Sequence, residues 1–283
     1  MRIVITGASG FVGRRLVSRL SERGDEVVAL TRTPAGKVEL PGLRWRAWDP
    51  DAAGSWQDEI EDADAVVHLA GAPIAQRWTA AAKRRIDASR GGSGGRLVDA
   101  IEAASSPPKV YLSASASGYY GADRPGEVLT ESSEPGDDWL AGVCVNWEQP
   151  ALRAAELGAR EVRLRFGVVL DRGGGALDKM ILPLGAGVAR IGAGTNTMAW
   201  IHREDVVRLL LRALDDETMA GPYNTVAPEA VSAASLASEL GKQMRRPVVP
   251  SPVFAVKLGL GEAVVILTGS QHLVPERTLA SGF

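Results

Sequence analysis

Short apolar runs alternate along the chain with stretches in which apolar residues repeat every three to four positions. The runs 2–6, 26–31, 64–70, 109–113 and 162–166 predict buried strands, because apolar residues form the majority of each. Val12, Leu16 and Leu20 predict one face of a helix that Gly24 ends. Further helices are predicted around 144–157 and over 206–214. Strands that alternate with helices in this way are typical of a parallel sheet covered on both faces.

A long helix is predicted over 79–104, and it contains the run Arg90-Gly-Gly-Ser-Gly-Gly-Arg96. Each glycine inside a helix costs about 1 kcal/mol relative to alanine. The sequence leaves two outcomes open: the helix breaks at the glycines, or close packing against a neighbour holds it.

The chain becomes rich in glycine after residue 170. Three consecutive glycines (173–175) predict a loop that covers the substrate. We therefore expect an α/β fold with a Rossmann-type doubly wound parallel sheet and a smaller C-terminal α/β lobe. The dinucleotide-binding domain is predicted over 1–170, with 196–226 returning to it. The substrate lobe is predicted over 171–195 and 227–283.

Composition narrows the class of protein. The 283 residues carry 32 Lys and Arg against 34 Asp and Glu, so the formal net charge is −2, which does not favour nucleic-acid binding. Cys144 is the only cysteine, so the sequence predicts neither an internal disulfide nor a metal site. No signal segment and no apolar stretch of membrane-spanning length is present. We expect a cytoplasmic protein that does not bind a membrane.

The first functional motif is Thr6-Gly-Ala-Ser-Gly-Phe-Val-Gly13, which follows a predicted strand and opens a predicted helix. In this context the first glycine permits a tight turn, the second lets a pyrophosphate approach the backbone, and the third lets the helix pack on the strand. The alternative is a structural turn that is merely rich in glycine. The cofactor-binding residues predicted here are Gly7, Ser9, Gly10, Phe11, Val12 and Gly13.

The end of the second strand predicts the cofactor type. NAD sites usually place an acid there, whereas this strand ends in Thr31 and Arg32. A guanidinium suits a ribose 2′-phosphate, so NADP is favoured over NAD unless Arg32 is only a solvated surface residue. Arg14 is a weaker candidate for the same phosphate. Asp49 is predicted to reach the adenine amino group, although an ordinary turn aspartate before Pro50 fits the sequence as well.

Four motifs together resemble the extended short-chain dehydrogenase/reductase superfamily, and within it the atypical subgroup called epimerase family proteins. They are the glycine-rich turn, His68-Leu-Ala-Gly71, Ser113-Ala-Ser-Ala-Ser117 and Ala199-Trp-Ile-His-Arg-Glu-Asp205. The subgroup is further matched by Ser89-Arg90, Ser117-Gly-Tyr-Tyr-Gly121, Trp147-Glu148 and Arg165-Phe-Gly-Val-Val-Leu170. The resemblance implies that Leu69, Ala70 and Gly71 also contact an NAD(P) cofactor and that the C-terminal lobe closes over a substrate.

The sequence departs from the superfamily at the catalytic residues. The superfamily's catalytic device is a Tyr-x-x-x-Lys pair, and counting back from Glu148 places Leu140 and Cys144 at its two positions. Ser115 matches the superfamily's active-site serine, and Tyr119 and Tyr120 follow it. We predict these three as catalytic residues; the alternatives are a small polar strand end and packed aromatic rings.

For Cys144 and for a run of basic residues, we favour a structural interpretation over a functional one. Cys144 is interpreted as a buried structural cysteine rather than a nucleophile, because nothing basic surrounds it in the sequence. The basic run 83–85, together with Arg77 and Arg90, could bind a substrate phosphate, but a solvated helix face is the favoured interpretation.

Three functions follow from these residues. The first is an NADP-dependent oxidoreductase on a small molecule, with reduction favoured because a neutral tyrosine can donate a proton without a neighbouring lysine. The second is a nucleotide-sugar epimerase or dehydratase. The third is a catalytically degenerate protein that senses NADP. A homodimer is a possible assembly.

Overall fold

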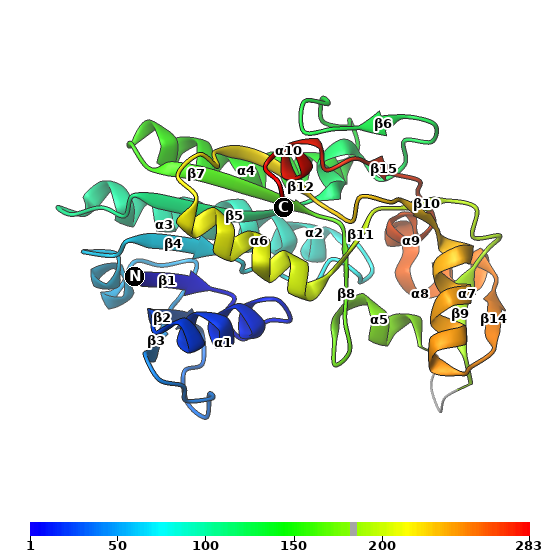
Figure 1. Ribbon diagram of the computed structural model, residues 1–283, viewed down its shortest axis with the longest axis horizontal. Helices are drawn as coiled ribbons and strands as arrows, with labels where there is room; N and C mark the ends of the chain where they lie inside the picture. Colours follow the sequence, from blue (N-terminus) through cyan, green and yellow to red (C-terminus); the bar gives the residue numbers. More distant parts are fainter. Residues whose placement is uncertain (182–185) are drawn as a thin grey trace.

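The computed structural model describes residues 1–181 and 186–283. Its centre is a seven-stranded parallel sheet in the order β12-β7-β5-β4-β1-β2-β3 (Figure 1). Every neighbouring pair in this sheet is parallel, with Ile3 opposite both Val27 and Ala65. The strands are β1 (Arg2–Thr6), β2 (Glu26–Thr31), β3 (Leu43–Ala47), β4 (Ala65–His68), β5 (Val110–Ala116), β7 (Arg160–Phe166) and β12 (Gly221–Thr225).

Helices cover both faces of the sheet because successive strand residues point to opposite sides. Ile3 and Ile5 pack in one buried cluster with α1 (Gly13–Arg23) and α6 (Arg203–Asp215). Val4 packs in the other, with α3 (Ser93–Ala103) and α4 (Trp139–Glu156). The prediction of a doubly wound α/β fold is confirmed.

The glycine run of the predicted helix 79–104 produces a change of helix type. The segment divides into α2 (Ala80–Asp87), a π-helical turn over Ala88–Gly92 and then α3. Glycines in this region pack closely against α4: a Cβ on Gly91 would lie 2.9 Å from the carbonyl oxygen of Asn146, and one on Gly94 would lie 2.9 Å from Cγ of Pro150. Close packing therefore holds the segment, and the π-turn accommodates it.

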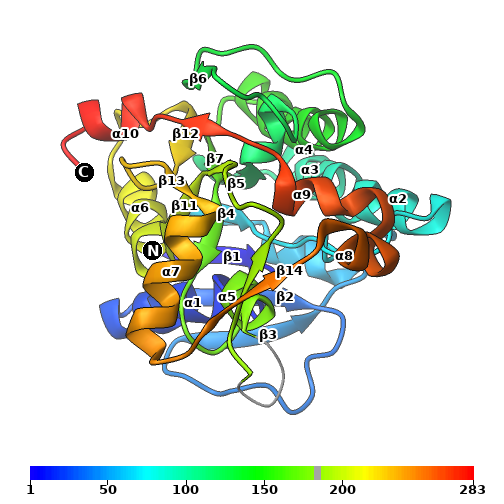
Figure 2. The ribbon, with the colours of Figure 1, turned by 90° about the vertical axis from the view of Figure 1, so that its right-hand side faces the viewer.

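The remaining elements lie mostly beyond the sheet. This part of the molecule faces the viewer in Figure 2. The chain returns from it at β12, the edge strand of the central sheet. The predicted limits of the substrate lobe stay a prediction, and residues 182–185 of its segment 171–195 lie outside the described residues. The paired short strands are β6 (Val128–Leu129) with β15 (His272–Leu273), β8 (Val168–Leu170) with β11 (Trp200–His202), β9 (Val188–Ile191) with β14 (Val248–Ser251), and β10 (Thr197–Met198) with β13 (Val231–Ser232). The helices are α5 (Gly175–Met180), α7 (Ala233–Met244), α8 (Val253–Leu260), α9 (Val265–Thr268) and α10 (Glu276–Ala280).

Strand β3 is an element that the apolar-run criterion does not find. Its residues alternate between partly buried Leu43 and Trp45 and exposed Arg44 and Arg46. An edge strand needs only one apolar face, so a search for continuous apolar runs passes over it. Among the described residues, none of the helices combines the length and apolar character needed to cross a membrane.

Candidate functional site

The carboxyl ends of β1 and β4 meet in very close backbone contact. Gly7 has φ +71°, and a Cβ there would lie 2.6 Å from the carbonyl carbon of Leu69 and 2.8 Å from the backbone nitrogen of Ala70. A Cβ on Gly13 would lie 2.2 Å from the carbonyl oxygen of Gly7, and one on Gly10 would lie 3.0 Å from the same oxygen. Gly7 is therefore required by conformation and by space, and Gly13 by space, whereas a side chain at Gly10 would meet one tight contact.

The N-terminus of α1 is open to a ligand that carries negative charge. The backbone N–H groups of Phe11, Val12 and Gly13 find no acceptor in the described part of the chain. The first turn carries no acidic side chain, and Val12 at the N-cap supplies no side-chain acceptor. Ser9 and Gly10 are exposed beside it. Free N–H groups, a positive helix end and glycines that keep side chains away together fit a dinucleotide pyrophosphate.

The adenosine-side residues lie at the ends of β2 and β3. Thr31 ends β2, and Arg32 follows with its side chain exposed and without an ion pair among the described residues. Asp49 is exposed after β3, and its Oδ1 accepts a hydrogen bond from the backbone N–H of Asp51 at 2.9 Å. That contact is the ordinary turn role, so the predicted adenine contact of Asp49 stays a prediction.

The segment 173–175 lies against the glycine-rich turn. A Cβ on Gly174 or Gly175 would lie 2.8 Å or 2.7 Å from the ring of Phe11. Arg14 donates from Nη2 to the carbonyl oxygen of Gly173 at 2.8 Å. The predicted substrate cover therefore contacts the turn that is predicted to hold the cofactor phosphates, and Arg14 is occupied in this contact.

A buried histidine, His68, connects the end of β1 to the π-turn and to α3. His68 Nδ1 lies 2.7 Å from Oγ1 of Thr6, and Nε2 lies 3.3 Å from both the carbonyl oxygen of Arg90 and Oγ of Ser93. Because Thr6 Oγ1 also accepts from the backbone N–H of Ala70, its hydroxyl hydrogen is assigned to Nδ1, and Nε2 carries the ring hydrogen. Burial lowers the pKa of His68 to about 4, so this neutral form persists at pH 7.

The predicted active-site serine belongs to a buried ion-pair network. Ser115 is 1% exposed and donates to Oε1 of Glu148 at 2.8 Å. Glu148 also accepts from Nε and Nη2 of Arg165, at 2.8 Å and 2.9 Å, and from Nη1 of Arg163 at 3.0 Å. Burial lowers the pKa of Arg165, but the contacts with Glu148 outweigh it and hold that pKa above its ordinary value. The hydroxyl hydrogen of Ser115 is thus committed to a carboxylate.

The two tyrosines occupy different environments. Tyr120 is fully buried; its hydroxyl donates to Oδ1 of Asn224 at 2.7 Å and accepts from Nη1 of Arg165 at 2.9 Å. Burial raises the pKa of Tyr120 to about 12. Tyr119 is partly exposed; its ring centroid lies 3.4 Å from Cζ of Arg165, and its hydroxyl has no protein partner in the described part of the chain. Of the three predicted catalytic residues, Tyr119 has the free hydroxyl, and all three roles stay predictions.

Leu140 and Cys144 fill the space beneath the segment that carries Tyr119. A Cβ on Gly118 would lie 2.8 Å from Cγ of Leu140 and 3.3 Å from Sγ of Cys144. Burial raises the pKa of the Cys144 thiol to about 12. These contacts and this pKa support the interpretation of Cys144 as a structural residue, and they leave no ionised group at the two positions of the family's catalytic pair.

The favoured interpretation of the basic run as a solvated face is wrong for one of its members. Arg84 and Arg85 are exposed, as a solvated face requires, but Arg90 is only 8% exposed. It lies on the π-turn four residues after the buried Ile86, and this helical spacing is the sequence signal that could have identified it.

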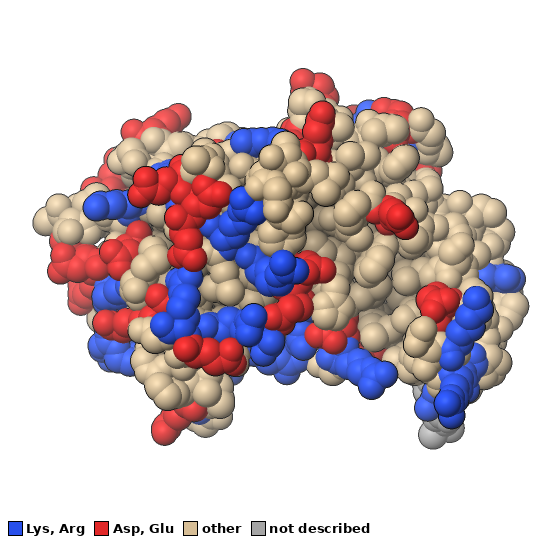
Figure 3. Space-filling model, viewed as in Figure 1, with Lys and Arg blue, Asp and Glu red and all other residues tan. Residues whose placement is uncertain are grey.

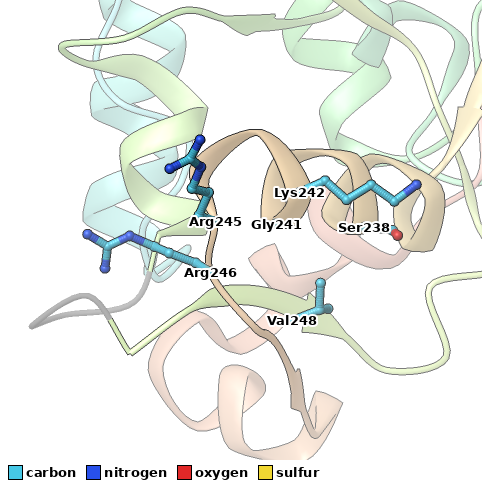
Figure 4. Close-up of a pocket in the computed structure, with 6 residues that line it drawn as sticks. All are labelled: Ser238, Gly241, Lys242, Arg245, Arg246 and Val248. Carbon is cyan, nitrogen blue, oxygen red and sulfur yellow. The ribbon is translucent and has the colours of Figure 1, made fainter.

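Two surface pockets lie away from these strand ends. One, of about 340 Å³, is lined by residues of α7 and by Arg245, Arg246 and Val248 (Figure 4). The other, of about 430 Å³, lies between α3 and α4. Basic side chains gather over α7, whereas basic and acidic ones interleave over α1 and α6, where Arg15 pairs with Glu204 at 2.7 Å (Figure 3). Neither pocket includes a residue of the glycine-rich turn.

The strand order, the glycine-rich turn after β1 and the open N-terminus of α1 define a Rossmann-type dinucleotide-binding protein. The chain belongs to the NAD dependent epimerase/dehydratase family, whose model matches residues 3–226. A model described as a domain of unknown function, DUF1731, matches residues 251–283. The predicted family and the binding of an NAD(P) cofactor are thereby confirmed.

Named relatives cover the whole chain. It is 37% identical over 289 residues to the Arabidopsis thaliana protein named epimerase family protein SDR39U1 homolog, chloroplastic, and covers 82% of that protein. The crystal structure of human epimerase family protein SDR39U1 (isoform2) with NADPH is 32% identical, with a TM-score of 0.85 over 100% of this chain and 94% of that chain. A nucleoside-diphosphate sugar epimerase from Corynebacterium glutamicum is 33% identical with a TM-score of 0.79; the match spans 100% of this chain and 54% of that one.

Proposed function

We propose that this protein is an NADP(H)-dependent oxidoreductase that reduces a carbonyl group or an activated double bond of a small molecule. The observation that carries the cofactor preference is Arg32, an exposed guanidinium at the carboxyl end of β2 where NAD sites usually hold an acid. The NADPH in the structure of the human relative supports the same choice.

The proposed roles of the chain's residues follow from their positions. The N–H groups at the start of α1 hold the pyrophosphate, and Arg32 holds the 2′-phosphate. Bound NADPH supplies the hydride. Tyr119, whose hydroxyl has no partner among the described residues and whose ring lies against the Arg165 guanidinium, donates the proton to the developing alkoxide. A direct catalytic contact of Ser115 with the substrate would require its hydroxyl to leave Glu148, so in this proposal Ser115 acts by holding that carboxylate.

Two other functions each have one supporting observation. Nucleotide-sugar epimerisation is supported by the name of the Corynebacterium relative, but an epimerase needs an acid/base pair, which Leu140 and Cys144 do not provide. An NADP-sensing role without catalysis is supported by that same replacement. The cytoplasmic location, the small-molecule substrate and the homodimer remain proposals of the same standing.

The cofactor proposal is tested by fluorescence titration with NADPH and NADH. Losing an Arg–phosphate contact costs about 1.5–3 kcal/mol, so Arg32→Ala should weaken NADPH binding roughly ten- to a hundredfold and leave NADH binding unchanged. Arg84→Ala, which removes an exposed arginine from α2, is the matched control. Equal affinity of the parent protein for the two cofactors would refute the preference.

The reductase proposal is tested by single-turnover oxidation of NADPH over a panel of carbonyl compounds and enones. Tyr119→Phe should slow turnover of any substrate found by at least tenfold, since general acid catalysis contributes typically 10²–10⁴-fold. Cofactor that stays bound and reduced across the whole panel would favour the sensing role instead.

A further inference from the structure

Arg90 is a buried cation that forms no ion pair with the described residues, although the charge of Asp87, three residues earlier, offsets part of the lowering of its pKa by burial. Its side chain donates to two carbonyl oxygens, of Ala72 at 3.0 Å and of Ile86 at 3.2 Å, and to Oγ of Ser89 at 3.4 Å. Among the described residues no carboxylate lies within ion-pair distance of it, whereas Arg165, which is also buried, is paired with Glu148. A buried charge without a partner is costly, so a group that supplies negative charge is expected to bind it.

The guanidinium still has hydrogen-bonding capacity. Of its five N–H groups, Nη1 uses two and Nη2 uses one, which leaves Nε–H and one Nη2–H without acceptors in the described part of the chain. Trp147 lies against it, with the ring centroid 4.8 Å from Cζ of Arg90. Trp147 is 8% exposed, and its indole Nε1–H is a buried donor without an acceptor among the described residues. This contact pair therefore has three donors that no described residue accepts from.

The position of Arg90 follows from Gly71, the residue that ends the segment after β4. A Cβ on Gly71 would lie 3.2 Å from Cζ and 3.3 Å from Nη2 of Arg90, so the glycine lets the guanidinium approach the backbone closely at this strand end. Gly71 itself is exposed. Arg90 thus lies directly behind an exposed glycine in the segment that touches the Gly7 turn.

The strand order of the sheet indicates which half of a bound dinucleotide would lie over Gly71 and Arg90. The 2′-phosphate site at the end of β2 and the pyrophosphate site after β1 lie on one side of β4 in the order β3-β2-β1-β4-β5. A dinucleotide that crosses β1 from the β2 side extends its other half over the ends of β4 and β5. Arg90 contacts the ring of Trp147, which lies three residues after Cys144 on α4. Arg90 therefore brings a cation to the helix that carries the position where the family's catalytic lysine is missing.

We propose that Arg90, delivered by the π-turn, donates its unused N–H groups to phosphate and ribose oxygens in the nicotinamide-side half of bound NADP(H). This rests on the proposed function only in that a dinucleotide binds. It differs from a purely structural clamp between Ala72 and the π-turn, which would have no effect specific to one half of the cofactor.

The test compares NADPH with adenosine 2′,5′-bisphosphate, which carries the adenosine half, the 2′-phosphate and one 5′-phosphate. Calorimetric titration of the parent protein and of Arg90→Met should show NADPH binding weakened roughly ten- to a hundredfold, while the bisphosphate binds within twofold of the parent. Arg32→Ala should weaken both ligands. This contrast separates a failure of the Arg90 proposal from a failure of the NADP preference.

Arg160→Met is the matched control, because Arg160 also donates three side-chain hydrogen bonds, all to carbonyl oxygens, but begins β7, at the opposite end of the sheet. It should leave both affinities unchanged. If Arg90→Met does not fold, Arg90→Lys and Trp147→Phe carry the test, since the first keeps the charge and the second keeps an aromatic ring. NADPH affinity that is unchanged in the folded variants, or that falls equally with bisphosphate affinity, would overturn the proposal.

Discussion

Glu148→Gln should destabilise the protein strongly, although it changes the size of the side chain little. Glu148 is 2% exposed and accepts four hydrogen bonds, one from Ser115, two from Arg165 and one from Arg163. The glutamine removes the negative charge and turns one acceptor into an N–H₂ group that faces other donors. Breaking one side of a buried ion pair costs about 3–5 kcal/mol. At about 2–4 °C per kcal/mol, the melting temperature should fall by roughly 6–20 °C.

The assay is urea unfolding together with thermal melting, with Glu262→Gln as the control. Glu262 pairs with Lys83 at 2.8 Å, but its side chain is 72% exposed, so its loss should cost no more than about 1 kcal/mol. Adding Arg165→Met to Glu148→Gln should cost less than the sum of the two single changes, because the double variant leaves no unpaired Arg165 charge. A Glu148→Gln protein within about 1 kcal/mol of the parent would refute the reasoning that this charge is indispensable.

Two further predictions concern the cofactor turn and its base. Gly10→Val should abolish NADPH binding, because a side chain there blocks the approach of the pyrophosphate to the backbone. The fold should be retained, because Gly10 is exposed and the only close contact of a Cβ there among the described residues is the Gly7 oxygen at 3.0 Å. Normal NADPH binding by a folded variant would contradict this. His68 has a pKa lowered to about 4 by burial against about 6.5 when unfolded, so its stabilising contribution is complete above pH 6.5 and is lost as the pH falls towards 4. Urea unfolding at pH 7 and pH 5 should show a smaller loss of stability in His68→Gln than in the parent, and equal losses would argue against a neutral buried histidine.

The elements that the sequence predicts well are those governed by local rules. The first two strands match their predicted limits, and Gly24 ends α1 with φ +84°. The glycine-rich turn is equally local, because the neighbours that exclude a Cβ from Gly13 are Gly7 and Ala8. For such features, the spacing of a few residues contains the physical cause.

The candidate site contains contacts that no local rule reaches. The hydroxyl of Tyr120 bonds to Asn224, 104 residues further along the chain, and Ser115 bonds to Glu148 on a different element. The sequence shows a serine and two tyrosines after a strand, but it does not show that a carboxylate and a guanidinium already occupy two of their hydroxyls. The contacts of the Arg90 guanidinium with Ala72 and Trp147 likewise join residues that are far apart along the chain.

The π-turn makes the length of its segment as important as its composition. Each residue of an α-helix advances the chain by about 100° of rotation, so removing one residue from the turn would re-form ordinary helix and rotate everything before it relative to α3. Arg90 would then no longer lie behind Gly71, even with every side chain retained. Single-residue insertions and deletions should therefore be tolerated in the mostly exposed stretch 35–39 but not between Ile86 and Leu97, where the register positions Arg90 behind Gly71.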